Sequence, residues 1–303
     1  MNSDLLKKRI MIIGSNGMLG QRLTENYKAD SKVELFCCSA EESSFIENVE
    51  YLRLDITIKK NVHDAIQQFY PDFIISAAAY TNVDGCETEK ELAWKVNVTG
   101  VENIARHAIL SDAHVIHIST DYVFDGKNGP YSEKDLPNPI GYYGRTKLAS
   151  ENALKTAPIK NTIIRTNVLY GPAKHGRPDF VKWVVNSLRG KKKIRIVTDQ
   201  INNPTFLDDL VDGINRIIEY KKEGLYNIGG SELLSRYEFT LRIADFFELD
   251  KSLIEQIVTS ELNQPAPRPL NSGLLNLKAQ TELGYRPLSL DFTFSRIKKE
   301  LDL

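Results

Sequence analysis

The stretch Ile10-Met11-Ile12-Ile13-Gly14-Ser15-Asn16-Gly17-Met18-Leu19-Gly20 decides the fold. A short apolar run is followed by three glycines in GxxGxxG spacing and then by a helical pattern. Glycine permits a tight turn, a close approach of the backbone to a pyrophosphate, and close packing of helix on strand. The helix N-terminus then presents N–H groups to an anion. The stretch predicts a dinucleotide-binding loop, with contacts from Gly14, Asn16, Gly17, Met18 and Leu19. A tight turn without a ligand is the alternative.

Short β-branched runs alternate with longer amphipathic stretches up to about residue 170. Near-continuous apolar strands that alternate with helices indicate a parallel sheet covered on both faces. We therefore predict an α/β chain with a Rossmann-type doubly wound parallel sheet. The predicted strands are 10–13, 33–36, 51–54, 73–76, 114–118 and 162–165, and the amphipathic stretches between them include 62–69 and 87–110.

The pattern changes after residue 170, where glycine and proline cluster at 171–178. We predict a dinucleotide-binding domain at 1–170 and a smaller C-terminal substrate-binding domain at 171–303. Parts of about 195–228 are expected to return to the first sheet. Helices are expected at 180–188, 207–221, 236–248 and 290–301, and an extended loop at 263–268.

Composition excludes several classes of function. The 303 residues include 39 basic and 40 acidic side chains, so no basic excess exists to neutralise a nucleic acid. No apolar run approaches the length of a membrane span, and the N-terminus has no signal-peptide core, which favours a cytoplasmic protein. Cys37, Cys38 and Cys86 have no metal-site spacing, and Cys37 and Cys38 are expected to be buried near a strand end. The acidic run at 87–91 is interpreted as a solvated helix face, so no metal is expected.

Two YxxxK matches occur, and only one suits catalysis. Tyr170 and Lys174 enclose Gly171-Pro172, which a regular helix does not accommodate. Tyr143 and Lys147 lie in a helical stretch, where an i,i+4 pair projects from one face. A nearby ammonium favours the phenolate, so we expect Lys147 to bring the pKa of Tyr143 towards neutrality. A surface contact between the two side chains is the alternative.

Hydroxyl groups end the fifth predicted strand at Ser119-Thr120, 23 residues before Tyr143. Open α/β sheets bind ligands at the carboxyl ends of their strands. A hydroxyl there can donate a hydrogen bond to a substrate carbonyl beside the tyrosine. Strand-end capping by these hydroxyls, and a turn or helix-cap role for Asp121, are the alternatives.

Together these motifs resemble the dTDP-4-dehydrorhamnose reductase family of extended short-chain dehydrogenase/reductases. The string Ser-Thr-Asp-Tyr-Val-Phe-Asp-Gly at 119–126 is the most specific part. A tryptophan common in that family is replaced by the run Asn167-Val168-Leu169. The likeness covers almost the whole chain through the stretches 14–20, 77–84, 97–100, 119–126, 143–147, 165–171, 199–205, 226–230, 235–239 and 268–272.

The resemblance implies roles for individual residues. Thr120, Tyr143 and Lys147 match the family's catalytic triad, and Lys147 also holds the nicotinamide ribose. Asn97 matches an asparagine that organises the site. The further residues expected at the cofactor are Ser39, Asp55, Ile56, Ala77, Ala78, Ala79 and Asn97. Those expected at the substrate are Tyr80, Thr120, Asp121, Asn167 and Arg268, with the 204–205 region beside them.

The implied activity is NAD(P)H-dependent reduction of the C4 ketone of a nucleotide-linked 4-keto-6-deoxy sugar. The best candidate is conversion of dTDP-4-dehydrorhamnose to dTDP-rhamnose. A sugar-nucleotide epimerase and a non-catalytic regulatory subunit like that of methionine adenosyltransferase remain alternatives. A dehydratase is disfavoured because Tyr122 stands where those enzymes have a glutamate. The expected partner is a nucleotide sugar, and a homodimer is possible.

The cofactor is expected to be NADPH or NADH. Specificity for NAD usually comes from an acidic residue about 20 residues past the glycines. No acid occurs between the second strand and Glu41, and no base occurs from Val33 through Leu52. Arg22 is the nearest base, and a solvated position is expected for it. The sequence therefore predicts dual use, with no carboxylate to repel a 2′-phosphate.

Overall fold

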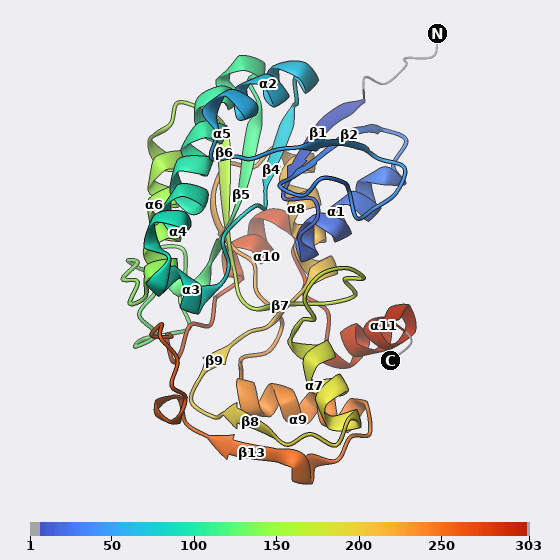
Figure 1. Ribbon diagram of the computed structural model, residues 1–303, viewed down its shortest axis with the longest axis vertical. Coiled ribbons are helices and arrows are strands. Elements are labelled where there is room, and N and C mark those ends of the chain that lie inside the picture. Colours follow the sequence, from blue (N-terminus) through green and yellow to red (C-terminus); the bar gives the residue numbers. More distant parts are fainter. Residues whose placement is uncertain (1–6, 302–303) are drawn as a thin grey trace.

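The computed structural model describes residues 7–301. Its main feature is a parallel sheet (Figure 1). Its strands are β1 (Lys8–Ile13), β2 (Val33–Ser39), β3 (Glu50–Arg53), β4 (Phe73–Ser76), β5 (His114–Thr120), β6 (Asn161–Thr166) and β11 (Gly224–Asn227). They lie in the order β11-β6-β5-β4-β1-β2-β3, and every neighbouring pair is parallel. This order reverses direction next to β1, which confirms the predicted Rossmann-type sheet.

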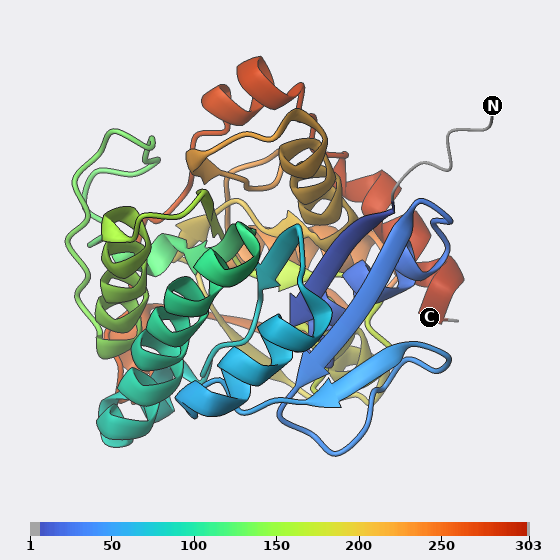
Figure 2. The same ribbon diagram turned by 90° about the horizontal axis from the view of Figure 1, so that it is seen from above.

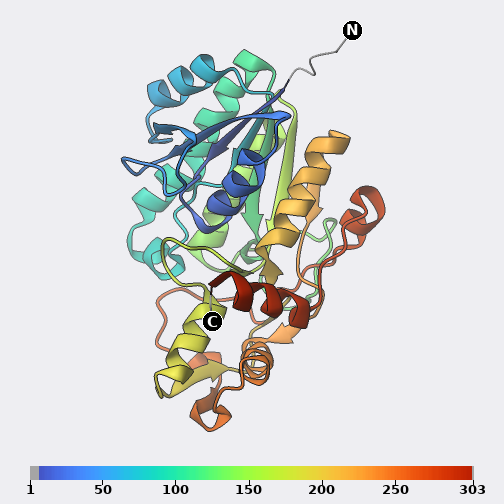
Figure 3. The ribbon, with the colours of Figure 1, turned by 90° about the vertical axis from the view of Figure 1, so that its right-hand side faces the viewer.

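Helices cover both faces of this sheet (Figures 2 and 3). Alternate residues of β1 serve the two sides, because successive side chains of a strand point to opposite faces. Ile10 and Ile12 pack with apolar residues of α1 (Met18–Lys28) and α8 (Leu207–Tyr220). Met11 and Ile13 pack with those of α2 (Lys59–Phe69), α5 (Gly100–Ala108) and α6 (Tyr142–Thr156).

The prediction of one amphipathic stretch over 87–110 is wrong at its start. Helix α3 (Val83–Thr88) begins where the Asn82 side chain accepts a hydrogen bond from the Gly85 N–H (3.0 Å). Glu89 then leaves helical geometry, with φ −112° and ψ 52°, and α4 (Lys90–Trp94) follows. A π-helical turn, Lys95–Thr99, joins α4 to α5. Such turns often occur at functional sites.

The C-terminal residues form a smaller layered unit with its own core. Helices α7 (Phe180–Arg189), α9 (Arg236–Phe246) and α11 (Leu290–Leu301) pack together with a parallel pair of strands, β8 (Ile194–Val197) and β13 (Ile254–Ile257). The predicted helices of this part are present, and 263–268 contains no helix or strand. The remaining elements are β7 (Leu169–Tyr170), β9 (Ile201–Asn202), β10 (Thr205–Phe206), β12 (Leu234–Ser235) and α10 (Leu277–Leu283).

The chain passes between the two units several times. Helix α8 and strand β11 follow residue 171 in sequence, yet α8 covers the large sheet and β11 pairs with β6. In Figure 1 the large sheet lies above and α7, α9, β8 and β13 lie below. The carboxyl ends of the sheet strands face the space between the two units, which places the site there.

Three buried free cysteines lie in the upper unit, Cys37 and Cys38 on β2 and Cys86 in α3. Burial raises the pKa of each thiol, so none is an activated thiolate. Within residues 7–301, no helix combines the length and apolar character that a membrane crossing requires.

Candidate active site

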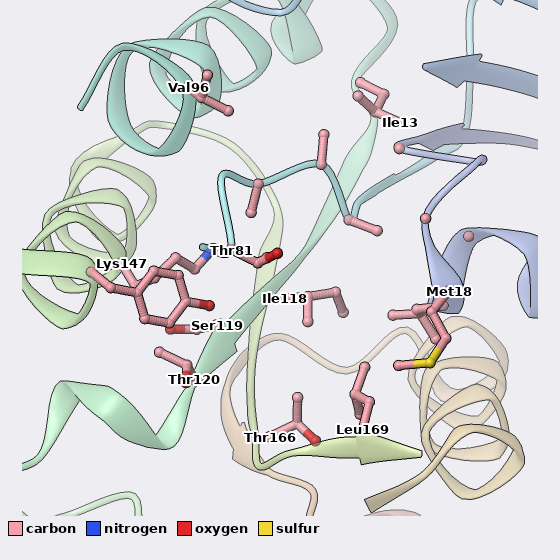
Figure 4. A pocket seen from close by; sticks show the side chains of 18 of the residues that line it. Ile13, Met18, Thr81, Val96, Ile118, Ser119, Thr120, Lys147, Thr166 and Leu169 are labelled. Atoms are coloured by element: carbon pink, nitrogen blue, oxygen red, sulfur yellow. The ribbon is translucent and has the colours of Figure 1, made fainter. Parts of the chain in front are cut away.

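A cavity of about 730 Å³ lies at the carboxyl ends of the sheet strands. Figure 4 shows Thr81, Ser119, Thr120 and Lys147 together at one end of it, with Met18 facing from the other. The sequence-predicted residues that line it are Gly14, Gly17, Met18, Leu19, Ser39, Asp55, Ile56, Ala77, Ala78, Ala79, Thr120, Asp121, Tyr143, Lys147 and Asn167. Asn16, Tyr80, Asn97 and Arg268 are absent from the lining.

Two positions of the glycine loop, Gly14 and Gly20, accept only glycine. Gly14 has φ +91°, and a Cβ there would lie 2.6 Å from the backbone nitrogen of Ala78. A Cβ on Gly20 would lie 2.1 Å from the carbonyl oxygen of Gly14. The loop therefore packs directly on the turn after β4, and α1 starts at Met18 with its first N–H groups beside the cavity.

Asn16 forms hydrogen bonds with the segment that follows β2. Its Nδ2 donates to the Ser43 carbonyl (2.9 Å) and to Oε2 of Glu41 (3.2 Å). Its Oδ1 accepts from the Phe45 N–H (2.9 Å). A direct contact between Asn16 and the cofactor therefore stays a prediction. In this structure Asn16 holds Glu41 in position.

Glu41 lines the cavity beside Ser39 and Gly17. Burial opposes its ionisation, but hydrogen bonds from Ser39, its own backbone and Asn16 outweigh burial and lower the pKa of the carboxyl. The expectation that this region lacks a carboxylate is therefore wrong. The carboxylate follows the last residue of β2 by two positions, a point where Rossmann-type folds bind the adenosine ribose.

Arg22 is not the solvated side chain that the sequence suggested. It forms ion pairs with Asp208, with Glu300 (3.0 Å) and with Glu25 (3.3 Å), where α1 meets α8 and α11. Hydrogen bonds from Arg22 to these carboxylates raise its pKa despite burial. The side chain is therefore committed to helix packing and lies outside the lining of the cavity.

Asn97 connects the turn after β4 with α6. Its Oδ1 accepts from the Tyr80 N–H (2.7 Å), and its Nδ2 donates to the Tyr80 carbonyl (3.2 Å) and to Oγ1 of Thr146 (3.0 Å). Because Thr146 lies between Tyr143 and Lys147, Asn97 fixes the helix that carries both. The Tyr80 hydroxyl donates to Glu89 and does not reach the cavity. Asn97 is thus a positioning residue in this structure.

Lys147 is buried beneath the cavity, and its Nζ lies 3.0 Å from Nε2 of His117. Burial lowers the pKa of Lys147 to about 8, an effect that Glu151 partly offsets. Burial also lowers the pKa of His117 well below its usual value, so the neutral ring accepts from the ammonium. The other ring nitrogen of His117 lies 3.2 Å from Oγ of Ser76, which fixes the ring.

Tyr143 rests as the neutral phenol. Burial raises its pKa, the negative charge of Asp121 adds to this, and the Thr120 hydroxyl acts in the opposite sense. The expectation that Lys147 brings the pKa of Tyr143 towards neutrality is wrong, because burial dominates and raises this pKa. A neutral phenol is the form that donates a proton.

Thr120 and Asp121 form a buried hydroxyl–carboxyl pair at the end of β5. Thr120 donates to Oδ1 of Asp121 (2.9 Å), and Ser272 donates to Oδ2. Burial raises the pKa of Asp121. Asn167 donates to the Ser272 carbonyl (3.2 Å), which brings the C-terminal segment to the same place. For Thr120 to polarise a substrate carbonyl, its hydroxyl hydrogen must rotate away from Asp121.

Arg268, expected at the substrate, is held by other groups. Its two terminal nitrogens donate to the two oxygens of Asp84 (3.0 and 2.8 Å), and one also donates to the Ala266 carbonyl (2.8 Å). The alternative tyrosine, Tyr170, is buried in the C-terminal core, with its hydroxyl 2.9 Å from that of Thr293. Tyr170 is therefore structural, as its place outside a helix suggested.

The lining residues that the sequence did not single out as site residues include Glu41, Thr81, Arg177 and Arg236. Glu41 carried a usable signal, because it follows Gly20 by 21 residues. Arg236 carried none beyond its place after the helix cap Ser235. Among residues 7–301, no three His, Cys, Asp or Glu side chains group as metal ligands would.

The chain is similar to known proteins over most of its length. The model of the family described as RmlD substrate binding domain matches residues 8–299. The chain belongs to this family. A dTDP-4-dehydrorhamnose reductase from Aggregatibacter actinomycetemcomitans is 34% identical over 291 residues, 92% of this chain and 94% of that protein. Methionine adenosyltransferase 2 subunit beta from Bos taurus is 30% identical and covers 89% of this chain and 81% of its own length.

A solved structure superposes closely on this chain. The crystal structure of dTDP-4-dehydrorhamnose reductase from Bacillus anthracis, in complex with NADP, has a TM-score of 0.87 at 32% identity. It covers 97% of this chain and 99% of its own. The chain is therefore an RmlD-family protein that resembles sugar-nucleotide reductases.

Proposed function

We propose that this RmlD-family chain reduces the C4 ketone of a nucleotide-linked 4-keto-6-deoxy sugar, with dTDP-4-dehydrorhamnose as the first candidate. The observation that carries the proposal is the set Thr120, Tyr143 and Lys147 in one cavity that continues to the glycine loop. Its volume of about 730 Å³ lies within the range of ordinary ligand sites.

The residues present fit a nicotinamide dinucleotide. The free N–H groups of the α1 N-terminus suit the pyrophosphate, and the Ala77–Ala79 turn forms a small-residue wall along the cavity. Asp55 and Ile56 line the same end, near Glu41 and Ser39. The reduced dinucleotide, NADPH or NADH, supplies a hydride when bound.

This chain's own residues supply the proton for the C4 oxygen and orient the ketone. Tyr143 holds a proton as the neutral phenol and delivers it to the sugar oxygen at C4. Thr120 orients and polarises the ketone once its hydroxyl turns from Asp121. Lys147 carries a buried positive charge that stabilises the phenolate left after transfer. His117 and Asn97 keep Lys147 and its helix in place.

One assay tests this proposal. The chain is mixed with dTDP-4-dehydrorhamnose and NADPH or NADH, and oxidation of the cofactor is followed by absorbance. We expect steady turnover, with Tyr143→Phe as the inactive comparison. An epimerase would change the sugar without net oxidation of the cofactor.

A regulatory role is the second candidate, and the likeness to methionine adenosyltransferase 2 subunit beta supports it. The complete set Thr120, Tyr143 and Lys147 favours catalysis, because a binding subunit has no need of a buried Lys147 beside a neutral phenol. Binding of NADPH without turnover of any keto-sugar nucleotide would favour the regulatory role.

A further inference from the structure

Arg236 is a lone cation on the C-terminal side of the cavity. It is the first residue of α9, after the capping box of Ser235 and Glu238. Its guanidinium carbon lies 4.9 Å from the centre of the Phe180 ring, and the side chain lines the cavity. Among residues 7–301, no carboxylate forms an ion pair with it, whereas Arg242 of the same helix pairs with Glu232 and Asp291.

The surroundings of Arg236 leave its charge without a matched anion. A guanidinium does not deprotonate in proteins, and a half-buried charge is costly unless an anion accompanies it. Burial lowers the pKa of Arg236, the charge of Arg268 acts in the same direction, and Tyr122 and Asp121 act against both. Both oxygens of Asp121 already accept from Thr120 and Ser272.

The other cations of the lining have different positions. Lys147 lies at the reaction centre against His117. Arg177 lies on the 171–179 loop, which is bound to α1 through hydrogen bonds between Gln21 and the backbone of His175 (3.1 and 3.2 Å). Arg177 is therefore on the dinucleotide side. Arg236 lines the cavity near Asp121 and Tyr122, the two residues that follow Thr120.

We propose that Arg236 binds the diphosphate of the nucleotide sugar, whereas the sequence had placed Arg268 at the substrate. The inference rests on the proposed function, because it requires a nucleoside diphosphate as part of the substrate. The planar guanidinium matches two phosphate oxygens at once, and stacking on Phe180 holds its plane fixed. Arg268 is paired with Asp84 and lies outside the lining of the cavity.

Direct binding separates this role from turnover. Affinities for dTDP and UDP are measured by calorimetry on the NADP-loaded chain, for wild type, Arg236→Gln and Arg236→Lys. Removal of a charge-assisted hydrogen bond predicts a dTDP or UDP dissociation constant raised about 10- to 100-fold in Arg236→Gln, with partial recovery in Arg236→Lys. Arg242→Gln, on the same helix but outside the cavity, is the matched control and should bind like wild type. NADPH affinity should be unchanged in all variants, which shows that they are folded.

The outcomes distinguish the inference from the proposed function. If wild type binds dTDP or UDP and Arg236→Gln binds it equally well, the inference is overturned while the reductase proposal stands. If wild type binds NADPH but neither nucleotide, the proposed function fails and the inference fails with it. A loss confined to Arg236→Gln supports both. In turnover assays the same variant should raise KM more than it lowers kcat.

Discussion

At the scale of single residues, the proton donor is the clearest test of the site. Tyr143→Phe removes the transferable proton and almost no volume, so we expect kcat to fall by a factor of about 10² to 10⁴. Binding of NADPH should be retained. Measurement of kcat and of the cofactor dissociation constant checks both expectations.

Tyr170→Phe is the matched control for that change. It removes a buried hydroxyl that pairs with Thr293, so it should lower the free energy of unfolding by about 1–3 kcal/mol. It should leave kcat nearly unchanged. If Tyr170→Phe abolishes turnover and Tyr143→Phe does not, the assignment of the site is wrong.

Glu41 changes the expectation for cofactor choice. An ionised carboxylate at this point accepts hydrogen bonds from a ribose 2′-hydroxyl and repels a 2′-phosphate. We expect kcat/KM for NADH to exceed that for NADPH, in place of the dual use predicted from the sequence. Glu41→Gln should shift this ratio towards NADPH by about tenfold, equivalent to about 1.4 kcal/mol. Initial rates with both cofactors decide it, and a ratio that the substitution leaves unchanged would remove Glu41 from the ribose site.

Lys147 makes the pH dependence of the protein predictable. Its folded pKa of about 8 is below the ordinary lysine value of 10.5, so the unfolded chain binds more protons between these pH values. This group therefore makes the folded state more stable as the pH rises from about 8 to 10.5. Activity moves the other way, because Lys147 loses its charge above pH 8. We expect the free energy of unfolding of wild type to rise between pH 7.5 and pH 10 through this group. Lys147→Met should abolish this part of the rise, and urea unfolding at both pH values measures it.

At the scale of elements, Arg268 joins α3 to the irregular segment 263–268. Its bidentate pair with Asp84 is partly exposed, so Arg268→Ala should cost about 1 kcal/mol of stability, measured by denaturant unfolding. Its effect on the KM for the nucleotide sugar should be smaller than that of Arg236→Gln. A larger effect on KM would return Arg268 to the substrate pocket.

The sequence predicted the elements better than the contacts at their ends. Strands of the large sheet carry near-continuous apolar runs, which can be recognised in the sequence without tertiary information. The break at Glu89 and the π-helical turn around Asn97 depend on contacts with Tyr80 and Thr146, which lie outside that stretch. The short pair β8 and β13 joins residues about 60 apart, so no local pattern shows it.

The same limit separates the site residues that the sequence found from those it missed. Gly14, Tyr143 and Lys147 belong to motifs with local spacing. The partners of Arg268 and Arg22 are Asp84 and Asp208, each more than 180 positions away in the chain. Whether an arginine faces a cavity or a carboxylate is decided by such distant partners, so Arg236 and Arg268 could not be told apart from the sequence.

At the scale of the whole molecule, residues that follow position 170 complete the core of the large sheet. Ile10 and Ile164 of the sheet pack in the same cluster as Leu210 and Ile214 of α8. A fragment 1–170 would keep α1 but lose α8 from this face of the sheet, so we expect it not to fold alone. Circular dichroism and thermal melting of the fragment check this, and a cooperative melt like that of the full chain would show that residues 1–170 are independent.

The transfer of hydride to the sugar is the central claim, and isotope labelling tests it most directly. The full chain is given dTDP-4-dehydrorhamnose and NADH or NADPH carrying deuterium at the transferred position of the nicotinamide. We predict that the cofactor is oxidised and that NMR finds the deuterium on C4 of the product sugar, whose nucleotide is intact. If the sugar remains unreduced while the cofactor is bound, or if the sugar changes configuration with no deuterium at C4, the chain is not a C4-ketone reductase.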